Sequence, residues 1–304
     1  MLGELFYWIF NMSIIASVMG LLVLIVRRIP RIPHRVSVLL WIVPFVRMCV
    51  PLGLNSPYSL MTLISRLTTK TVTVYQPADE LAFSLTNAIM AANSYFPITY
   101  KVSILDRVFE IAGSLWLVVA LAVVIAFVIL YLTTKREVKD AQRLDQNVFL
   151  SEKVESPAVY GIVRPKVLLP VSFADRELKY VLQHERTHIR RGDNLWRLLG
   201  FLAAAVHWFN PLSWVLLKVF LSDLELACDE AAISQYSDEE RREYAWSLLR
   251  CAQSRSVFVS AFGGAKVRTR IENILSYQQM TAVSAAGFTV LLIAILYTLL
   301  TNAG

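Results

Sequence analysis

The stretch VLQHERTHI at residues 181–189 is an instance of the H-E-x-x-H pattern. Its apolar residues recur at helical spacing, which predicts a helix. On a helix, His184 and His188 are one turn apart on one face, so their imidazoles can bind a single metal ion. Glu185, the next residue, can reach a water molecule bound to that metal. The pattern therefore predicts a catalytic metal site, against the alternative of a helix with two surface histidines.

The composition indicates a membrane protein. Of the 304 residues 56% are hydrophobic, and the mean hydropathy of +0.52 exceeds that of a soluble domain. The net charge is +7, but the basic residues cluster beside apolar segments, so we exclude direct nucleic-acid binding. Cys49, Cys228 and Cys251 are widely spaced and form no C-x-x-C, which excludes a disulfide framework and a cysteine zinc knuckle.

Four apolar segments are long enough to cross a bilayer, at about residues 5–26, 36–54, 111–132 and 280–301. The first has no positive charge before it and no evident cleavage site, so we interpret it as a retained span rather than a signal peptide. Arg47 lies within the second. We favour the interpretation that it snorkels to the outer surface, and a functional intramembrane charge is the alternative.

Positive charges set the orientation of these spans. Basic residues at 27–35, after residue 132 and before residue 280 place all three segments in the cytoplasm. The protein is therefore expected to be a multi-pass protein of the cell membrane with both termini outside. The predicted parts are three transmembrane helices at 1–132 with an external loop at about 55–108, a cytoplasmic domain at 133–280, and a fourth transmembrane helix with an external C-terminus at 281–304.

The segment before the H-E-x-x-H helix predicts a small sheet. After a charged, helical linker at 133–146, residues 147–151 predict one strand and residues 157–170 predict two short strands around a turn. The edge of such a strand can pair with an extended peptide and hold it across the metal. An ordinary sheet that covers the core is the alternative. The candidate substrate-binding residues are Tyr160, Gly161, Ile162 and Val163.

Residues 195–221 are again apolar, but Asn210-Pro211 divides them into two pieces that are too short to span a bilayer. We expect two packed helices that graze the membrane surface. His207 lies in this region. Such a residue is more often a hydrogen-bonded core histidine, and stabilisation of an oxyanion is the alternative role.

The metal needs a third ligand, because a catalytic zinc site combines three protein ligands with a water. On the next predicted helix, Glu225 and Asp229 are four residues apart and share a face among apolar neighbours. We predict that Glu225 is the third ligand and that Asp229 orients a ligating histidine. Asp193, which is expected to point away, and His207 are the alternatives. Cys228 is interpreted as a small buried residue.

The predicted chemistry follows from one zinc ion per chain. Zinc lowers the pKa of its bound water and polarises a peptide carbonyl. Glu185 takes the proton of that water and passes it to the leaving nitrogen. The predicted reaction is hydrolysis of a peptide bond, with the oxyanion-stabilising residue left open.

Four motifs together resemble the BlaR/MecR-type membrane metallopeptidases, which are antirepressors of antibiotic sensing. The motifs are GIVRPKVLLP at 161–170, HERTH at 184–188, FNPLSW at 209–214 and ELACD at 225–229. The resemblance covers most of the chain. It implies a mainly α membrane protein that has four transmembrane helices and a cytoplasmic α+β gluzincin-type zinc metalloprotease domain. It also implies the zinc ligands and the catalytic glutamate that the spacing predicts.

The best-known members of that family sense β-lactams and trigger loss of a DNA-binding repressor, with self-cleavage on activation. The resemblance therefore implies a cytoplasmic protein substrate such as a transcriptional repressor, with membrane lipid around the spans and a homodimer as one option. This sequence ends at Gly304 with no penicillin-binding domain and no S-x-x-K serine motif of that kind. We expect the input to come through residues 55–108 or a partner, unless the chain is a truncated form. Residues 254–264 are a candidate self-cleavage segment.

Two other classes of function stay open at this point. One is a housekeeping membrane protease of the heat-shock or prenyl-protein processing type, which also pairs H-E-x-x-H with a later E-x-x-x-D. The other is a non-catalytic membrane receptor or scaffold, against which the intact Glu185 argues. The Asn-Pro-Leu hairpin and the strand pair favour the signalling protease.

Overall fold

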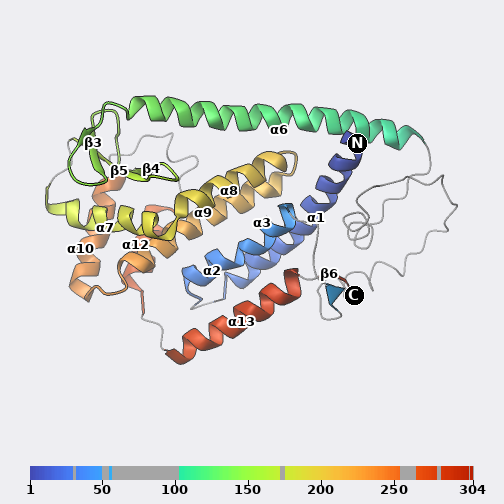
Figure 1. The fold of residues 1–304 in the computed structure, drawn as a ribbon. Coiled ribbons are helices and arrows are strands. Elements are labelled where there is room, and N and C mark those ends of the chain that lie inside the picture. The colour runs from blue at the N-terminus through green and yellow to red at the C-terminus, as the bar shows by residue number, and fades with distance from the viewer. Residues whose placement is uncertain are drawn as a thin grey trace.

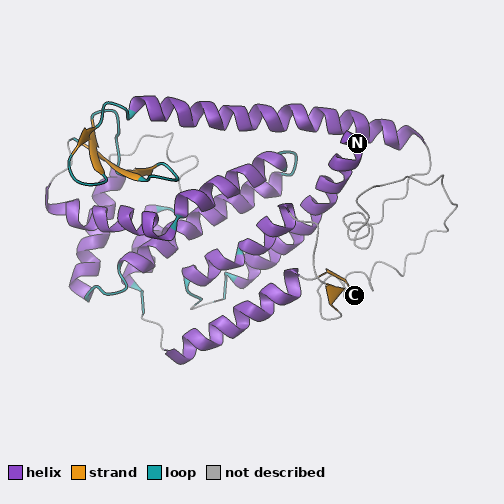
Figure 2. Ribbon diagram, viewed as in Figure 1, coloured by secondary structure: helices purple, strands orange, loops and turns teal. Residues whose placement is uncertain are grey.

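The protein is a mainly helical molecule with one small sheet, seen in a computed structural model (Figures 1 and 2). The structure describes residues 1–29, 32–49, 55–56, 103–171, 175–253, 265–278, 282–300 and 302–303. Most of the expected external loop and the candidate self-cleavage segment lie outside these residues. A two-residue strand β1 (Asn55–Ser56) pairs in parallel with β6 (Asn302–Ala303) near the end of the chain.

Within the described part of the chain, two helices are long and apolar enough to cross a membrane. They are α1 (Leu2–Val26) and the apolar stretch Arg107–Arg136 of α6 (Ser103–Glu137). Each contains one of the predicted spans, because uninterrupted apolar runs favour a continuous helix in which every backbone group is paired. A further helix, α13 (Ala282–Leu300), coincides with the fourth predicted span and carries a shorter apolar stretch.

The second predicted span is wrong as a single helix. The chain forms α2 (His34–Leu40) and α3 (Ile42–Cys49), which are separated at Trp41. Pro44 explains the break, since proline has no N–H to donate to the carbonyl of residue 40 and its ring clashes there. The snorkelling interpretation of Arg47 is also wrong, because this side chain is only 1% exposed and protein encloses it.

Helices α1 and α6 touch backbone to backbone near the N-terminus. A Cβ atom built on Gly113 would lie 2.7 Å from the carbonyl oxygen of Leu2, and one on Gly3 would lie 3.1 Å from the backbone nitrogen of Glu110. Neither backbone can move away from such a Cβ atom unless its whole helix shifts. The close contact between these two helices therefore depends on glycine at both positions.

We expect Gly113→Ala to lower the free energy of unfolding by about 1–3 kcal/mol, the usual cost of overpacking. Denaturant or thermal unfolding of the detergent-purified chain measures this change. Gly287→Ala in α13 is the matched control, because a Cβ there meets no described atom within 4 Å. Equal stability of the two variants would contradict the close approach of α1 and α6.

Two helices form a hairpin that packs against α1. They are α8 (Asp193–Val206) and α9 (Pro211–Ala232), and the Asn210 side chain caps α9 by accepting from the Leu212 N–H. Asn210 Nδ2 also donates to the hydroxyls of Ser13 and Ser17 at 2.8 and 2.7 Å. Ser13 lies at the middle of α1, so the hairpin tip reaches the level of mid-helix. The expectation that these helices graze a membrane surface stays a prediction.

Helix α9 also corrects a predicted boundary. The second apolar piece of the hairpin and the segment that carries Glu225 form one continuous helix of 22 residues. One buried cluster of the described residues combines Ala16 and Trp41 with Ala203 and Phe220, so the core crosses the boundary predicted at residue 132. The region 133–280 is thus packed into the bundle rather than separate from it.

The small sheet lies beside the C-terminal end of α6 (Figure 1). Its strands, in the order β2-β3-β5-β4, are β2 (Gln142–Arg143), β3 (Val148–Ser151), β5 (Lys166–Pro170) and β4 (Ala158–Tyr160). Both predicted strand regions are confirmed, although the helical linker ends at Glu137 and β2 follows it. Strand β5 is central, and β4 is an edge strand.

The sheet covers the helix of the H-E-x-x-H motif, α7 (Asp175–Arg191). Val181 of α7 packs with Val148, Val167 and Leu169 in a buried cluster. Two further helices, α10 (Asp238–Gln253) and α12 (Val267–Leu275), close the other side. The face of α7 opposite the sheet therefore meets α9 and α10, and Arg270 of α12 reaches His184 on that face.

Candidate metal centre

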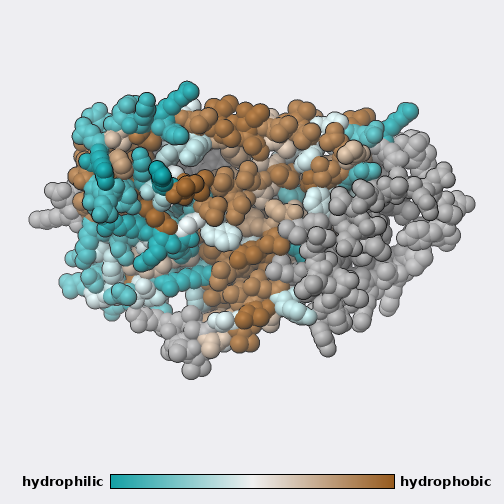
Figure 3. All heavy atoms as spheres, viewed as in Figure 1, coloured by the Kyte–Doolittle hydropathy of each residue, from teal (hydrophilic) through white to brown (hydrophobic). Residues whose placement is uncertain are grey.

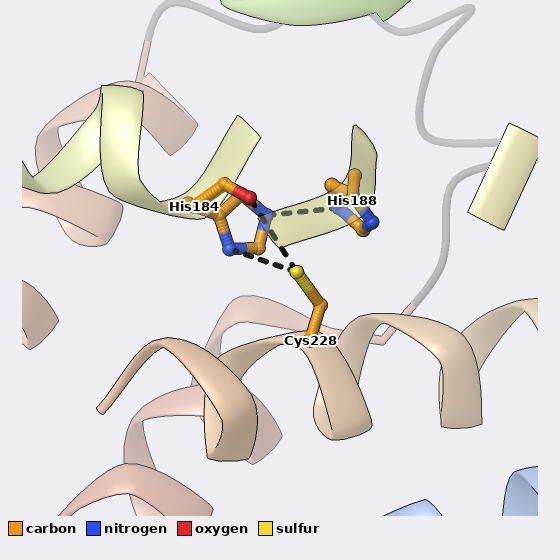
Figure 4. A group of neighbouring side chains, drawn as sticks. All are labelled: His184, His188 and Cys228. Carbon is orange, nitrogen blue, oxygen red and sulfur yellow. Dashed lines mark hydrogen bonds between the residues drawn. The ribbon is translucent and has the colours of Figure 1, made fainter. Parts of the chain in front are cut away.

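The two histidines of α7 are buried and face each other. His184 is 6% exposed and His188 is 3% exposed, and their Nε2 atoms are 3.1 Å apart (Figure 4). Two ring nitrogens at this distance cannot both carry a proton without conflict. The pair is arranged to share one cation between the two Nε2 atoms.

A carboxylate orients His188. Gly192 adopts φ +67°, a left-handed conformation that ends α7 and turns the chain into α8. This turn brings Asp193 back, so that His188 Nδ1 donates to Asp193 Oδ2 at 2.6 Å. Arg191 Nε donates to the other oxygen at 3.2 Å. The Asp193 carboxylate contacts His188 Nδ1, the ring nitrogen that faces away from His184, so the expectation that Asp193 points away is wrong.

His184 is oriented by a tyrosine and a carboxylate. Its Nδ1 lies 2.8 Å from the hydroxyl of Tyr244 in α10, and that hydroxyl donates to Asp229 Oδ1 at 2.8 Å. Asp229 Oδ1 itself lies 3.3 Å from the same Nδ1. With acceptors on the Nδ1 side of both rings, each histidine is held in the tautomer whose unprotonated nitrogen is Nε2, the nitrogen that can bind a metal. The structure thus places Asp229 beside His184, and its role in orienting a metal ligand stays a prediction.

Arg270 of α12 completes the cluster. It is 3% exposed, and its Nε and Nη2 donate to both oxygens of Asp229 at 2.7 Å. Burial raises the pKa of Asp229, but the Arg270 guanidinium and His184 outweigh it and hold this pKa at about 2. Arg270 Nη2 also lies 3.2 Å from His184 Nε2. The guanidinium therefore reaches both the supporting carboxylate and the metal-facing side of the histidine.

Glu225 lies where a third ligand is needed. Its oxygens are 3.7 Å from His184 Nε2 and 3.6 Å from His188 Nε2. Ligand atoms on a tetrahedral zinc with bonds of about 2.0–2.1 Å are roughly 3.3 Å apart, so the three side chains fit that ion with small adjustments. Arg197 Nη2 donates to Glu225 at 2.5 Å. Burial raises the pKa of Glu225, but His188, Arg270 and Arg197 outweigh this effect and lower the pKa.

Cys228 is the second candidate for the third ligand. His184, His188 and Cys228 offer ligand atoms that all lie within 4.8 Å of one another. However, the Cys228 sulfur lies 3.7 Å from His184 Nδ1 and donates to the His184 carbonyl at 3.5 Å (Figure 4). It thus approaches the edge of the ring that Tyr244 holds, whereas Glu225 faces the shared Nε2 atoms. Cys228 is the small buried residue that the sequence predicted, but its sulfur also lies within reach of both histidines, so Glu225 and Cys228 are both candidates for the third ligand.

A pair of substitutions separates the two candidates. We expect Glu225→Gln to lower the bound zinc of the purified chain well below one ion, because an amide is a weaker ligand than a carboxylate. Cys228→Ser is expected to retain zinc close to the wild-type amount. Metal analysis after dialysis against a weak chelator measures both variants. The reverse result, with zinc lost only in Cys228→Ser, would make the cysteine the ligand.

The predicted base and the predicted substrate strand lie beside these ligands. Glu185 follows His184 directly and is 7% exposed. Strand β4 is the sheet edge next to α7, and Asn194 Nδ2 donates to the carbonyls of Val159 and Gly161 at 3.2 and 2.8 Å. Since Asn194 follows Asp193, this amide ties the predicted peptide-binding edge to the residue that orients His188.

His207 lies away from the site. It follows the last residue of α8, about 20 Å from Asp193 by the rise of a helix. Its Nε2 lies 3.1 Å from the carbonyl oxygen of Met48 in α3. The role in oxyanion stabilisation is therefore corrected, and the commoner alternative, a hydrogen-bonded core histidine, describes this residue.

Sequence reasoning missed Tyr244, Arg270 and the orienting role of Asp193. Tyr244 and Arg270 are 60 and 86 residues from His184, and no local pattern connects them to it. Gly192 was the available signal for Asp193, because a left-handed helix end reverses the chain within one residue.

A buried H-E-x-x-H helix whose histidines converge with a downstream glutamate defines the class of metallopeptidases. A family model described as BlaR1 peptidase M56 matches residues 7–275. The chain belongs to this family, the M56 peptidases, which confirms the resemblance read from the four motifs.

The curated relatives carry regulatory names. The Regulatory protein BlaR1 of Bacillus licheniformis is 31% identical over 183 residues, which cover 55% of this chain and 30% of the relative. The Methicillin resistance mecR1 protein of Staphylococcus aureus (strain Mu50 / ATCC 700699) is 23% identical over 141 residues, which cover 43% of this chain and 24% of the relative. The match thus spans less than a third of the length of these relatives.

Proposed function

We propose that this protein is an integral-membrane zinc endopeptidase that acts in transmembrane signalling by cleaving a cytoplasmic protein such as a transcriptional repressor. The observation that carries the proposal is the convergence of His184, His188 and Glu225 beside the buried Glu185. Membership of a metallopeptidase family supports the activity. The names of the relatives, a regulatory protein and a resistance protein, support a role in signalling.

The residues of the site have distinct tasks in this proposal. Bound zinc would supply Lewis-acid polarisation of the peptide carbonyl and a water of lowered pKa. Glu185 accepts the proton of the attacking water and returns it to the leaving nitrogen. The end of β4 at Tyr160 and the bend that follows it, Gly161 to Val163, align the substrate as an added strand. Asp193, Tyr244 and Asp229 keep the histidine rings in place.

We further propose four transmembrane spans, the second of them formed by the broken pair α2 and α3, with both termini outside and the metal centre on the cytoplasmic side. Lys135 and Arg136 at the end of α6 support this orientation, because positive charge favours the cytoplasmic side. The N- and C-termini lie at one end of the molecule, and the sheet, α7 and α10 lie at the other (Figure 1). Hydrophilic side chains gather at that second end (Figure 3).

Helix α9 offers a route for a signal from the bundle to the metal. One side of it carries Asp223, which is fully buried and accepts from Arg27 at 2.5 Å and from Trp41 at 2.8 Å. Glu230 accepts from the first backbone N–H groups of α2. Another side of the same helix carries Glu225 and Asp229. A shift of α1 or α2 would therefore move α9, and with it the carboxylates of the site.

The substrate distinguishes the signalling protease from a housekeeping protease. The full chain is reconstituted in nanodiscs with zinc and offered a cytoplasmic DNA-binding repressor from the same cell, or fragments of an unfolded membrane protein. We expect site-specific cleavage of the repressor and little degradation of the fragments. Degradation of the fragments alone would favour the housekeeping class, and cleavage of neither would favour a receptor or scaffold. Mass spectrometry of the chain in the same reactions tests self-cleavage within residues 254–264.

A further inference from the structure

A cavity of about 1100 Å³ lies between α6, the β4–β5 turn and α8, outside the metal centre. Its walls are long apolar side chains, among them Phe127 and Val128 of α6 and Leu198 and Leu202 of α8. Val128, Leu198 and Leu202 are between 38% and 50% exposed. The space is therefore an apolar recess that the described residues leave unfilled.

The recess is apolar at one end and basic at the other. Along α6 its lining runs from Val124 to Thr134 and Lys135, and beyond the helix it continues to Lys139. Arg164 of the β4–β5 turn and Lys166, the first residue of β5, join the basic end, and no acidic residue is among the described residues that line it. A ligand that fits must therefore be apolar along its length and negatively charged at one end.

The length of the apolar part matches one leaflet of a membrane. Val124 and Lys135 are eleven residues apart on one helix, which corresponds to roughly 16 Å. Half of a hydrocarbon core of about 30 Å is about 15 Å. The basic end coincides with the basic end of α6, where the helix would leave the membrane. From its apolar end to its basic end, the recess is thus oriented along α6 as a lipid of the cytoplasmic leaflet would be.

We propose that this recess binds an anionic phospholipid of the cytoplasmic leaflet. The acyl chains lie between α6 and α8, and the phosphate lies against Lys135, Lys139 and Arg164, as basic pockets beside transmembrane helices bind lipid headgroups. The proposal rests on the membrane orientation given above, but not on peptidase activity.

The site would place a lipid against the predicted substrate strand. Tyr160 and Gly161 line the same recess, and the Tyr160 ring stacks on Tyr131 of α6 with centroids 5.2 Å apart. The Tyr160 hydroxyl donates to the Tyr131 carbonyl at 3.0 Å. A bound lipid would therefore pack against β4. Asn194, which donates to the carbonyls of Val159 and Gly161, connects this strand to the metal centre.

Native mass spectrometry of the full chain tests the proposal. The protein is released from detergent after incubation with phosphatidylglycerol or, separately, with phosphatidylcholine. We expect phosphatidylglycerol to remain bound under conditions that strip phosphatidylcholine. The triple substitution Lys135→Ala, Lys139→Ala and Arg164→Ala should weaken that binding roughly tenfold to a hundredfold, since each basic group contributes on its own.

Two further variants make the result specific. The triple substitution Lys153→Ala, Lys179→Ala and Arg268→Ala removes the same number of positive charges, but from exposed surface positions. This variant should bind phosphatidylglycerol as the wild type does. Leu202→Trp narrows the apolar end and should weaken retention of the lipid at least severalfold. Equal retention of both lipids, or equal loss in the two triple variants, would overturn the proposal. The proposal would also be overturned if apolar peptides displaced the lipid equally well with and without a negative charge. The recess would then be a peptide site.

The controls also separate this proposal from the proposed function. Zinc content, measured in each variant, reports whether the site region is still folded. Glu185→Gln should bind phosphatidylglycerol unchanged, whether or not the wild type cleaves peptides.

Discussion

Glu185→Gln is expected to lower peptide cleavage by about 10²–10⁴-fold while the chain keeps its zinc. The amide has nearly the shape of the carboxylate, so the fold of α7 and the histidine pair should be preserved. It cannot accept the proton of the attacking water, and general acid–base catalysis is worth this factor in rate. Cleavage of the repressor is followed by gel and mass spectrometry, and zinc is measured on the same preparation.

Arg186→Gln is the matched control for this experiment. Arg186 is the next residue of α7, its side chain is half exposed, and it forms an ion pair with Asp145 at the surface. We expect it to cleave as the wild type does. If Glu185→Gln and the wild type process the substrate equally, the catalytic proposal is wrong, whatever the zinc content.

Arg270→Ala is expected to lower the free energy of unfolding by about 3–5 kcal/mol, the usual effect of removing one partner from a buried ion pair. Asp229 is fully buried, and Arg270 donates to both of its oxygens. Without the guanidinium, the buried carboxylate must remain charged with only Tyr244 and His184 beside it, or take up a proton. Unfolding by denaturant in detergent, with a chelator present so that zinc does not compensate, measures the effect.

Two variants test the cause of this loss. Arg268→Ala removes an arginine two residues away on α12, whose ion pair with Glu272 is exposed, and should leave stability unchanged. The double variant Asp229→Asn and Arg270→Met removes both charges and should be more stable than Arg270→Ala alone. If the double variant is the less stable of the two, the unpaired carboxylate does not explain the loss.

The elements around the site were predictable because their signals are local. The H-E-x-x-H helix, the strands at 147–151 and 157–170 and the hairpin at Asn210-Pro211 follow from periodicity and turn residues within a few positions. The pairing of Glu225 with Asp229 follows from helical spacing in the same way. What these signals could not give is the packing of one element on another.

The sequence by itself determined the spacing of the histidines, the downstream carboxylates and the apolar helices, since each depends on neighbouring residues. Tertiary structure alone decided that Tyr244, Arg270 and Asp193 surround the histidines, because three separate elements bring them there. It also decided that Asn210 meets Ser13 at the middle of α1, which makes the hairpin part of the bundle. Buried polar groups require partners, and only the packed chain determines which residues, however distant in sequence, supply them.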